Sequence, residues 1–500
     1  MKALFRRPWW ITGVSLLLGG ALRGEESPFP DRELLAGARV GSIVQKPGQL
    51  YGHTADFGLI LVPENRNRPG SRLVVLPFIR HRARGDSSSA PVFILGGGPG
   101  KSNLWREMPE VFYTRNAVVH VGYRGVDGEV KLKCPEIGVA MTAERPLSHE
   151  TLDAFRRTIR SSYERLIREG VDPDGYSVME VVEDMEALRV ALGYGTINLF
   201  STSFGTQIGT LYCLRHPQAV HRNLMIGASR GVRGLDELWD PEVVDSMLGR
   251  YAALWQADGE ARGGSPDLLG TMRSVLGTLP VTWNGVFIDP DKVRLAAFYS
   301  LYETESAAAV LDAFVAAEKG DPGGLALLVV GYDEAVQDTT RQYWGEFLCK
   351  FASAGYDSTR DHEREMDPPG SVLGSPSAKL WWTAIPRGGW PVRQIPPEYR
   401  GPLTVRTRTL IVNGELDFSS PPANMREAAP WFPDGTVIEI PCMGHMDVFK
   451  LQRGAVDHLA ERFFLSGVAD TSRYRPHLID FTPEETLQGE ARRIFGTGGK

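Results

Sequence analysis

Apolar and polar positions along the chain follow two different periods. Runs rich in β-branched residues come early and predict strands in "DFGLILVP", "SRLVVLPFIRHRA", "PVFILGG" and "AVVHVGYRG". A helical pattern follows in "SVMEVVEDMEALRVALG", where apolar residues stand three or four positions apart. The pattern then predicts a strand in "TINLF", a helix in "FGTQIGTLYCLRHP" and a strand in "RNLMIGAS". This alternation predicts an α/β fold with a mostly parallel sheet covered by helices.

The middle of the chain, from about residue 230 to 396, has a different character. Helical stretches such as "ESAAAVLDAFVAAEK" dominate it, and strand patterns return afterwards in "TRTLIVNG" and "GTVIEIP". We predict a sheet domain in residues 25–229 and 397–485, a helical insertion at 230–396, and a peripheral tail at 486–500. Seven tryptophans either form the core of the insertion or wall an apolar pocket: Trp239, Trp255, Trp283, Trp344, Trp381, Trp382 and Trp390.

Residues 1–24 have the layout of a secretory signal peptide. Lys2 and two arginines precede a short apolar segment, and small residues follow it. Cleavage after Ala21 or after Gly24 fits this layout, and an uncleaved anchor helix is the alternative. We expect a secreted or periplasmic protein with no stable membrane insertion after signal cleavage.

Charge and cysteine content narrow the picture further. The net charge is -6 and the basic residues are spread along the chain, which excludes a nucleic-acid partner. Export makes disulfides possible, and four cysteines allow three full pairings, which stay open: they are Cys134, Cys213, Cys349 and Cys442. Cys213 lies in a helical stretch, where a buried free thiol is equally expected.

The turn "VFILGGGPGKSN" resembles the end of a phosphate-binding loop. Such a loop needs G-x-x-x-x-G-K-[ST], and counting back from Gly100 places Leu95 where the first glycine is required. Pro99 also removes one backbone N–H that could bind a phosphate. The sequence therefore argues against a nucleotide site.

A serine turn supplies candidate chemistry. In "TINLFSTSFGTQIG", Ser203 stands between a predicted strand and a predicted helix, where a hydroxyl projects above the sheet. The usual signature is G-x-S-x-G, and here Ser201 replaces its first glycine. Ser201 itself is a poor nucleophile candidate because no glycine lies two residues to either side.

A serine nucleophile needs a base and an orienting acid. In a site of this kind the partners follow in the order Ser, Asp or Glu, His, each after a strand. "TLIVNGELDFSSPP" supplies Asp417, and "TVIEIPCMGHMD" supplies His445. Glu415 is a rival acid, but it lies closer to the end of the strand, so we prefer Asp417.

The tetrahedral intermediate of acyl transfer needs two backbone N–H donors for its negative oxygen. The N–H of Phe204, directly after the candidate nucleophile, is expected to be one of them. The loop after an earlier central strand must supply the other, and "LGGGPG" is that loop. We therefore predict that the glycine turn holds an oxyanion.

The order GGGPG, "VGYRG", S-T-S-F-G-T, "GELDFSSPP" and "GHMD" resembles the α/β-hydrolase serine exopeptidases that include prolyl iminopeptidase and the secreted tripeptidyl aminopeptidases. The C-terminal "SRYRPHLIDFTP" resembles their TAP-like C-terminal region. The resemblance covers about residues 40 to 485. It implies Ser203 as nucleophile, Asp417 and His445 as its partners, Gly98 and Phe204 as oxyanion donors, and a helical cap over the site.

The sequence departs from the family pattern in three places. Gly96 stands where the HGGPG motif has its histidine, and Ser201 replaces a glycine. Relatives that clip amino-terminal residues carry a cap carboxylate after a cysteine to hold the substrate amine, whereas Lys350 follows Cys349 here. Glu346 and Glu303 are possible substitutes, with plain surface charge as the alternative for each.

The sequence thus predicts a secreted serine hydrolase that forms an acyl-enzyme on Ser203. The favoured function is a peptidase that removes an amino acid or a tripeptide from the amino terminus of peptides. The alternatives are a carboxylesterase or lipase acting on small apolar acyl esters, and a catalytically inactive binding protein. No metal or organic cofactor is expected, and the charged stretch "RDHEREMDP" is interpreted as a solvated loop.

Overall fold

A single mixed sheet organises the first and last parts of the chain in the computed structural model, which describes residues 27–85, 89–228 and 239–496. Within these residues nine strands lie in the order β1-β2-β3-β5-β4-β6-β7-β10-β11. Their bounds are β1 Ile43–Leu50, β2 His53–Pro63, β3 Leu73–His81, β4 Val92–Leu95, β5 Val118–Val121, β6 Ile197–Thr202, β7 Val220–Ile226, β10 Thr409–Gly414 and β11 Gly435–Ile440. Neighbours from β1 to β5 pair antiparallel, and those from β5 to β11 pair parallel. The predicted α/β class with a mostly parallel sheet is confirmed.

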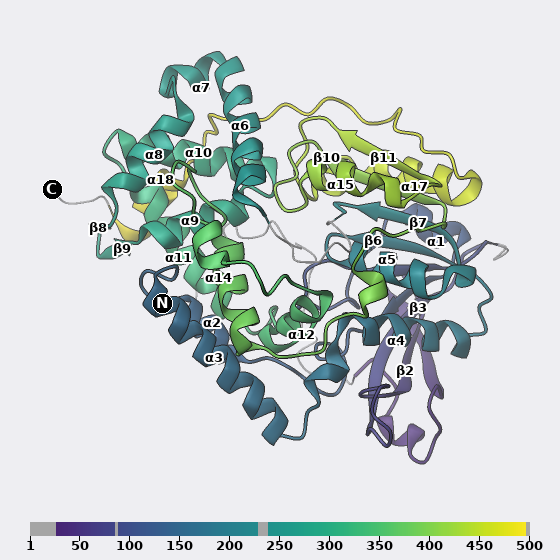
Figure 1. The fold of residues 1–500 in the computed structure, drawn as a ribbon. Helices are drawn as coiled ribbons and strands as arrows, with labels where there is room; N and C mark the ends of the chain where they lie inside the picture. Colours follow the sequence, from purple (N-terminus) through teal and green to yellow (C-terminus); the bar gives the residue numbers. More distant parts are fainter. Residues whose placement is uncertain (1–26, 86–88, 229–238, 497–500) are drawn as a thin grey trace.

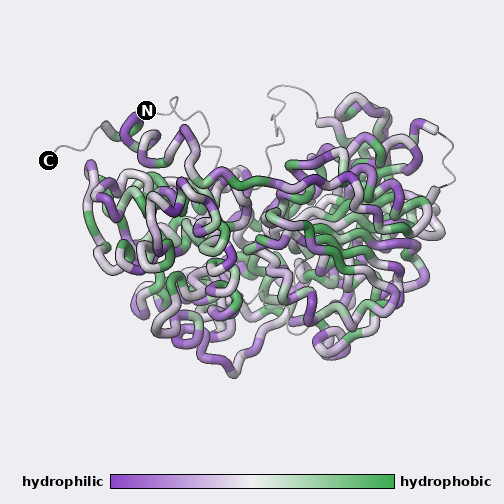
Figure 2. The backbone as a smooth tube through the Cα atoms, turned by 90° about the horizontal axis from the view of Figure 1, so that it is seen from above, coloured by the Kyte–Doolittle hydropathy of each residue, from purple (hydrophilic) through white to green (hydrophobic). Residues whose placement is uncertain are grey.

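The central strands are buried on both faces because helices cover both sides of the sheet. Every residue of β4, β6 and β10 is buried, which explains why apolar residues predominate in these strands. The hydrophobic residues of the sheet stand out in Figure 2. The covering helices are α1 Glu110–Arg115, α4 Val178–Ala191, α5 Gly205–Arg215, α15 Pro422–Ala428, α16 Asp447–Lys450 and α17 Arg453–Ser466.

The other helices form a separate lobe beside the sheet, which we call the cap (Figure 1). Its helices are α2 Pro135–Met141, α3 His149–Arg168, α6 Pro241–Ala257, α7 Gly259–Gly264, α8 Leu268–Thr278, α9 Pro290–Ser300, α10 Thr304–Glu318, α11 Gly323–Gln337, α12 Trp344–Ala354, α13 His362–Glu365, α14 Pro376–Ala384 and α18 Leu487–Phe495. A small hairpin of β8 Val281–Trp283 and β9 Val286–Ile288 completes it.

The cap draws on more of the chain than the predicted insertion at 230–396. The apolar face of α3, with Phe155 and Ile159, is buried in the same hydrophobic cluster as α14. At the other end, the segment after α17 crosses back to the cap in Figure 1, and α18 buries Leu487 and Ala491 there. The predicted peripheral tail is therefore wrong for α18, because an amphipathic pattern shows which face is buried but not which partner buries it.

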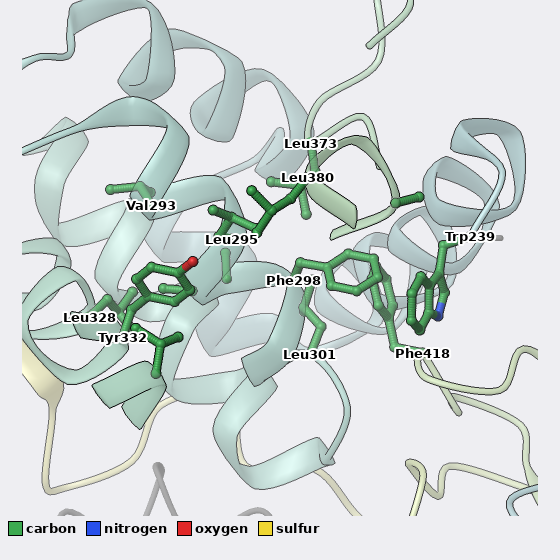
Figure 3. Close-up of a cluster of buried hydrophobic side chains, with 14 of the residues drawn as sticks. Trp239, Val293, Leu295, Phe298, Leu301, Leu328, Tyr332, Leu373, Leu380 and Phe418 are labelled. Carbon is green, nitrogen blue, oxygen red and sulfur yellow. The ribbon is translucent and has the colours of Figure 1, made fainter. Parts of the chain in front are cut away.

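Aromatic packing joins the cap to the sheet domain close to the predicted acid. Figure 3 shows Phe298 of α9 beside Phe418 and Trp239. The ring centroids of Phe298 lie 5.2 Å from Trp239 and 5.4 Å from Phe418, both in edge-to-face geometry. Because Phe418 directly follows Asp417, this contact fixes the loop that carries the acid.

The structure also bears on the predictions for the cysteines, the charged stretch and metal binding. The four cysteines are free thiols, and three of them are buried. The charged stretch predicted as a loop instead contains the short helix α13, whose His362 is buried. Among the described residues, no cluster of three potential metal ligands occurs and no helix is long and apolar enough to cross a membrane. The predicted signal peptide at 1–24 lies outside the described residues.

Candidate active site

A sharp turn between β6 and α5 carries Ser203. Its φ is +52°, in the left-handed region that non-glycine residues seldom adopt. The backbone N–H of Ser203 donates to the carbonyl of Ile226 at 3.0 Å, which ties the turn to β7. A Cβ atom at Gly205 would lie 2.3 Å from the carbonyl oxygen of Leu95, so only glycine lets α5 start this close to β4. The turn has the form predicted from the sequence.

Ser201 occupies the position of the missing first glycine without opening the turn. It is fully buried, and its hydroxyl donates weakly to the carbonyl of Leu224 at 3.4 Å. The facing residue on α5 is Gly209, where an added Cβ would lie 3.3 Å from the Ser201 hydroxyl. Gly209 on α5 is thus the small residue that lets this helix lie close to Ser201 of β6.

Ser203, His445 and Asp417 form one hydrogen-bonded chain. The Nε2 atom of His445 lies 2.8 Å from the Ser203 hydroxyl, and its Nδ1 lies 2.9 Å from Oδ2 of Asp417. Asp417 is completely buried, and the N–H of Ser420 donates to its Oδ1 at 2.6 Å. This is the geometry that a nucleophile, a base and an orienting acid require.

The rival acid, Glu415, faces a different partner. One of its carboxylate oxygens lies 3.6 Å from the Arg250 guanidinium, and the other accepts the N–H of Cys442 at 3.3 Å. Glu415 is also partly exposed, whereas Asp417 is sealed beneath His445. The geometry therefore favours Asp417 as the acid.

The electrostatics around His445 favour its protonated form. Burial of the imidazole lowers its pKa, but the Asp417 carboxylate outweighs this effect and Glu303 adds to it, so the pKa of His445 is raised above 6.5. The imidazolium that forms when Ser203 loses its proton is stabilised in this way.

This electrostatic balance predicts the pH dependence of turnover. Because only neutral His445 can accept the serine proton, kcat/KM for an uncharged substrate should be low in acid and rise through an apparent pKa above 6.5. Glu303 has a pKa of about 8 and is therefore mostly uncharged over this rise, so Glu303→Gln should leave the rise close to its wild-type position. Stopped assays from pH 5 to 9 provide the measurement. A large shift of the rise in Glu303→Gln would contradict the neutral state of Glu303.

The glycine loop after β4 lies directly against the nucleophile. A Cβ added at Gly97 would come within 3.0 Å of the Ser203 hydroxyl, and the N–H of Gly97 donates to Thr202 Oγ1 at 3.3 Å. Gly98 has a φ of +70°. Within the described residues, neither the N–H of Gly98 nor that of Phe204 donates to a protein acceptor. The two predicted oxyanion donors are thus unoccupied by protein groups.

Arg106 fills the space left by the missing histidine of the loop. A Cβ at Gly96 would lie 2.2 Å from the guanidinium carbon of Arg106, so the arginine lies flat over this glycine. Its Nη2 donates to the carbonyls of Gly97 at 3.4 Å and Ser102 at 3.3 Å. On the other side, the N–H of Gly96 donates to Asn103 Oδ1 at 2.7 Å.

A buried ion pair supports the same loop from the cap. The N–H of Gly100 donates to Oε2 of Glu346, whose Oε1 lies 2.6 Å from the ammonium of Lys350. Lys350 also lies 3.4 Å above the Tyr123 ring centre. Both charged side chains are completely buried, and burial raises the pKa of Glu346 and lowers that of Lys350. Glu346 is therefore neither surface charge nor, in this position, an amine-binding group of the cavity.

A cavity of about 650 Å³ opens above Ser203 and His445, between the sheet domain and the cap. Three of the seven predicted tryptophans line it, namely Trp239, Trp344 and Trp381. Trp255, Trp382 and Trp390 are buried in the cap core instead. The three tryptophans that line the cavity also belong to the cap core, so the two interpretations of the tryptophans are compatible.

Carboxylates of the cap border the cavity next to His445. Glu303 is 6% exposed, its carboxylate lies 2.9 Å from the Lys450 ammonium, and it accepts the N–H of Met446 at 3.2 Å. Burial raises the pKa of Glu303 to about 8 against the attraction of Lys450. Glu305, in the first turn of α10, also lines the cavity but is exposed and has no ion pair within the described part of the chain.

Comparison with known proteins agrees with this fold. A family profile described as alpha/beta hydrolase fold matches residues 90–450. The chain belongs to this family. As a hydrolase of this fold, it is 25% identical over 190 residues to the serine protease Hip1 of Mycobacterium tuberculosis and of Mycobacterium bovis. The match takes in 34% of this chain and spans about a third of those relatives, 35% of their length.

Two solved structures resemble the hydrolase more distantly. A thermophilic esterase from Thermogutta terrifontis is 14% identical, with a TM-score of 0.36 over 82% of this chain and 99% of the esterase. A meta-cleavage product hydrolase from Pseudomonas fluorescens is 14% identical, with a TM-score of 0.38 over 78% of this chain and 94% of that enzyme.

Proposed function

We propose that the protein is an exported serine peptidase that releases short amino-terminal pieces from peptides through an acyl-enzyme on Ser203. The observation that carries the proposal is the pair of cap carboxylates, Glu303 and Glu305, in the wall of a cavity whose floor holds Ser203 and His445. The similarity to a protein named as a serine protease supports peptide cleavage, and the pattern of residues 1–24 supports export.

The chemistry follows from the hydrogen-bonded chain. His445 takes the proton of Ser203 as its oxygen attacks the scissile carbonyl, and Asp417 holds the imidazole and stabilises its charge. The N–H groups of Gly98 and Phe204 receive the oxyanion. His445 then protonates the leaving amine, and water releases the acyl group by the reverse proton path.

Recognition of a free amino terminus falls to the cap in this proposal. Glu303 already pairs with Lys450, which neutralises the Glu303 carboxylate within the protein. Glu305 has no such partner in the described residues and is the carboxylate available to a substrate ammonium. An ion pair between Glu305 and a substrate ammonium inside the cavity is screened less by salt than a pair on an open surface, so it can contribute to substrate recognition.

A carboxylesterase is the second candidate, and the aromatic cavity wall favours it. Trp105, Phe200 and Phe449 join the tryptophans around the nucleophile, so much of the lining suits an apolar acyl group. An inactive binding protein is the least favoured candidate because the 2.8 Å contact of His445 with Ser203 already activates the hydroxyl.

Matched substrates separate these candidates. We expect the mature protein to hydrolyse aminoacyl or tripeptidyl chromogenic amides with a free amine, and to lose at least about tenfold in kcat/KM when the amine is blocked. Glu305→Gln should reduce this preference, whereas Glu150→Gln on the exposed face of α3 should not. Cleavage of a short acyl ester without any amide cleavage would replace the peptidase by the esterase. If a fluorophosphonate probe does not label the protein, the inactive binding protein becomes the remaining candidate.

A further inference from the structure

Two cationic side chains beside the oxyanion loop lack an acidic partner. Lys101 and Arg106 both line the cavity, on the segment that follows the oxyanion loop. Within the described residues, neither has a carboxylate within ion-pair distance. Of the other cations nearby, Lys450 pairs with Glu303 at 2.9 Å and Arg341 with Asp338 at 3.7 Å. Arg453 also lines the cavity without an ion pair in the described part of the chain, but it is exposed to solvent. The positive charge at the loop is thus left uncompensated by the protein.

The positions of these groups bring the charge close to the reacting centre. The stem of Lys101 folds back over Gly98, so that a Cβ at Gly98 would lie 3.2 Å from its Cδ. Arg106 lies over Gly96, and its Nε is buried with no hydrogen-bond acceptor. Two neighbouring positive charges in the wall of a cavity repel each other, and an anionic group of a ligand would relieve this repulsion.

We propose that Lys101 and Arg106 form a subsite for a carboxylate group of the substrate, beside the oxyanion loop. The inference rests on the proposed function and adds to it a substrate class: short peptides that carry a carboxylate near the scissile bond. A carboxylate can accept from the Lys101 ammonium, and the neighbouring Arg106 guanidinium adds its positive charge to the same place. An acidic side chain and a free C-terminal carboxylate offer this same chemistry.

Paired substrates test the subsite in two series. In the peptide series, glutamate is compared with glutamine at single positions, and a free C-terminus with its amide. In the ester series, p-nitrophenyl monoglutarate is compared with p-nitrophenyl valerate. We expect the charged member to be favoured by about tenfold or more in kcat/KM in at least one pair, and the pair that shows it identifies the source of the carboxylate.

Variants assign the preference to Lys101. Lys101→Met should lower the charged-to-neutral ratio about tenfold, and Lys101→Arg should retain most of it. Lys46→Met, on the exposed edge strand β1, is the matched control and should leave the ratio as it is. Glutarate should slow fluorophosphonate labelling of Ser203 in the wild type and much less in Lys101→Met.

The ratio also has a predicted pH dependence. Burial lowers the pKa of Lys101 most, the charges of Arg106, Lys450 and Arg341 add to this effect and Asp338 opposes it, and the resulting pKa is about 8. An amine is charged below its pKa, so the preference in kcat/KM should hold at neutral pH and decline above about 8. Both substrates of a pair require neutral His445 for turnover, so the titration of His445 cancels in the ratio of their kcat/KM values.

The outcomes separate this inference from the proposed function. Equal rates within every pair, or an unchanged ratio in Lys101→Met, would overturn the subsite even if peptides are cleaved. A carboxylate preference confined to the esters, with all peptides refused, would overturn the peptidase and leave the subsite standing.

Discussion

Replacing Ser203 by alanine is expected to remove about three or more orders of magnitude of turnover while the fold stays intact. The change deletes one oxygen, whose partner is Nε2 of His445 at 2.8 Å. The strained backbone is unaffected, because alanine and serine tolerate the φ of +52° about equally. Activity on the best substrate and the thermal unfolding midpoint, measured side by side, check both halves of the expectation.

Ser201→Ala is the matched control for this change. It removes a hydroxyl from the same turn, two residues away, whose bond to Leu224 at 3.4 Å is weak and which faces Gly209 rather than the cavity. Turnover should stay within a few-fold of the wild type. Activity of Ser203→Ala equal to that of Ser201→Ala would refute the nucleophile assignment.

The second large effect is expected for Asp417→Asn, a loss of about four orders of magnitude in kcat. Asparagine keeps the shape of the buried side chain, but its amide cannot hold the imidazole in the tautomer that leaves Nε2 free to accept the serine proton. It also removes the charge that outweighs burial and raises the pKa of His445. Single-turnover kinetics with an activated ester measure the loss in the acylation step.

Glu415→Gln separates the two candidate acids. Its carboxylate lies against Arg250 and the N–H of Cys442, so neutralising it should change turnover little. A collapse as deep as that of Asp417→Asn would move the acid to Glu415. Equal thermal stability of the two variants would rule out misfolding as the reason for a difference.

The strands and the order of the candidate catalytic residues along the chain could be predicted from the sequence because both depend on local patterns. A short, mostly apolar run bounded by turn residues is enough to predict a buried strand, as in β6 and β10. Each candidate residue lies within a few positions of the end of such a run, so Ser203, Asp417 and His445 could be predicted without knowing any distance between them.

Contacts between distant segments were not predictable in the same way. Nothing near Gly96 in the sequence shows that Arg106 fills the space above it, and nothing near Glu346 shows that it accepts the N–H of Gly100. The amphipathic pattern of α18 likewise does not show that this helix packs against the cap. Charged residues were therefore interpreted as surface groups, whereas the structure buries Glu346 completely and Glu303 almost completely.

The ion pair of Glu346 and Lys350 makes the loop beside Ser203 depend on a helix from the other lobe. During synthesis, the glycine loop leaves the ribosome about 250 residues before α12, so the newly made sheet domain lacks this support for its oxyanion donors. Asp417 and His445 arrive later still. The chain therefore stays a poor catalyst until its last third has docked.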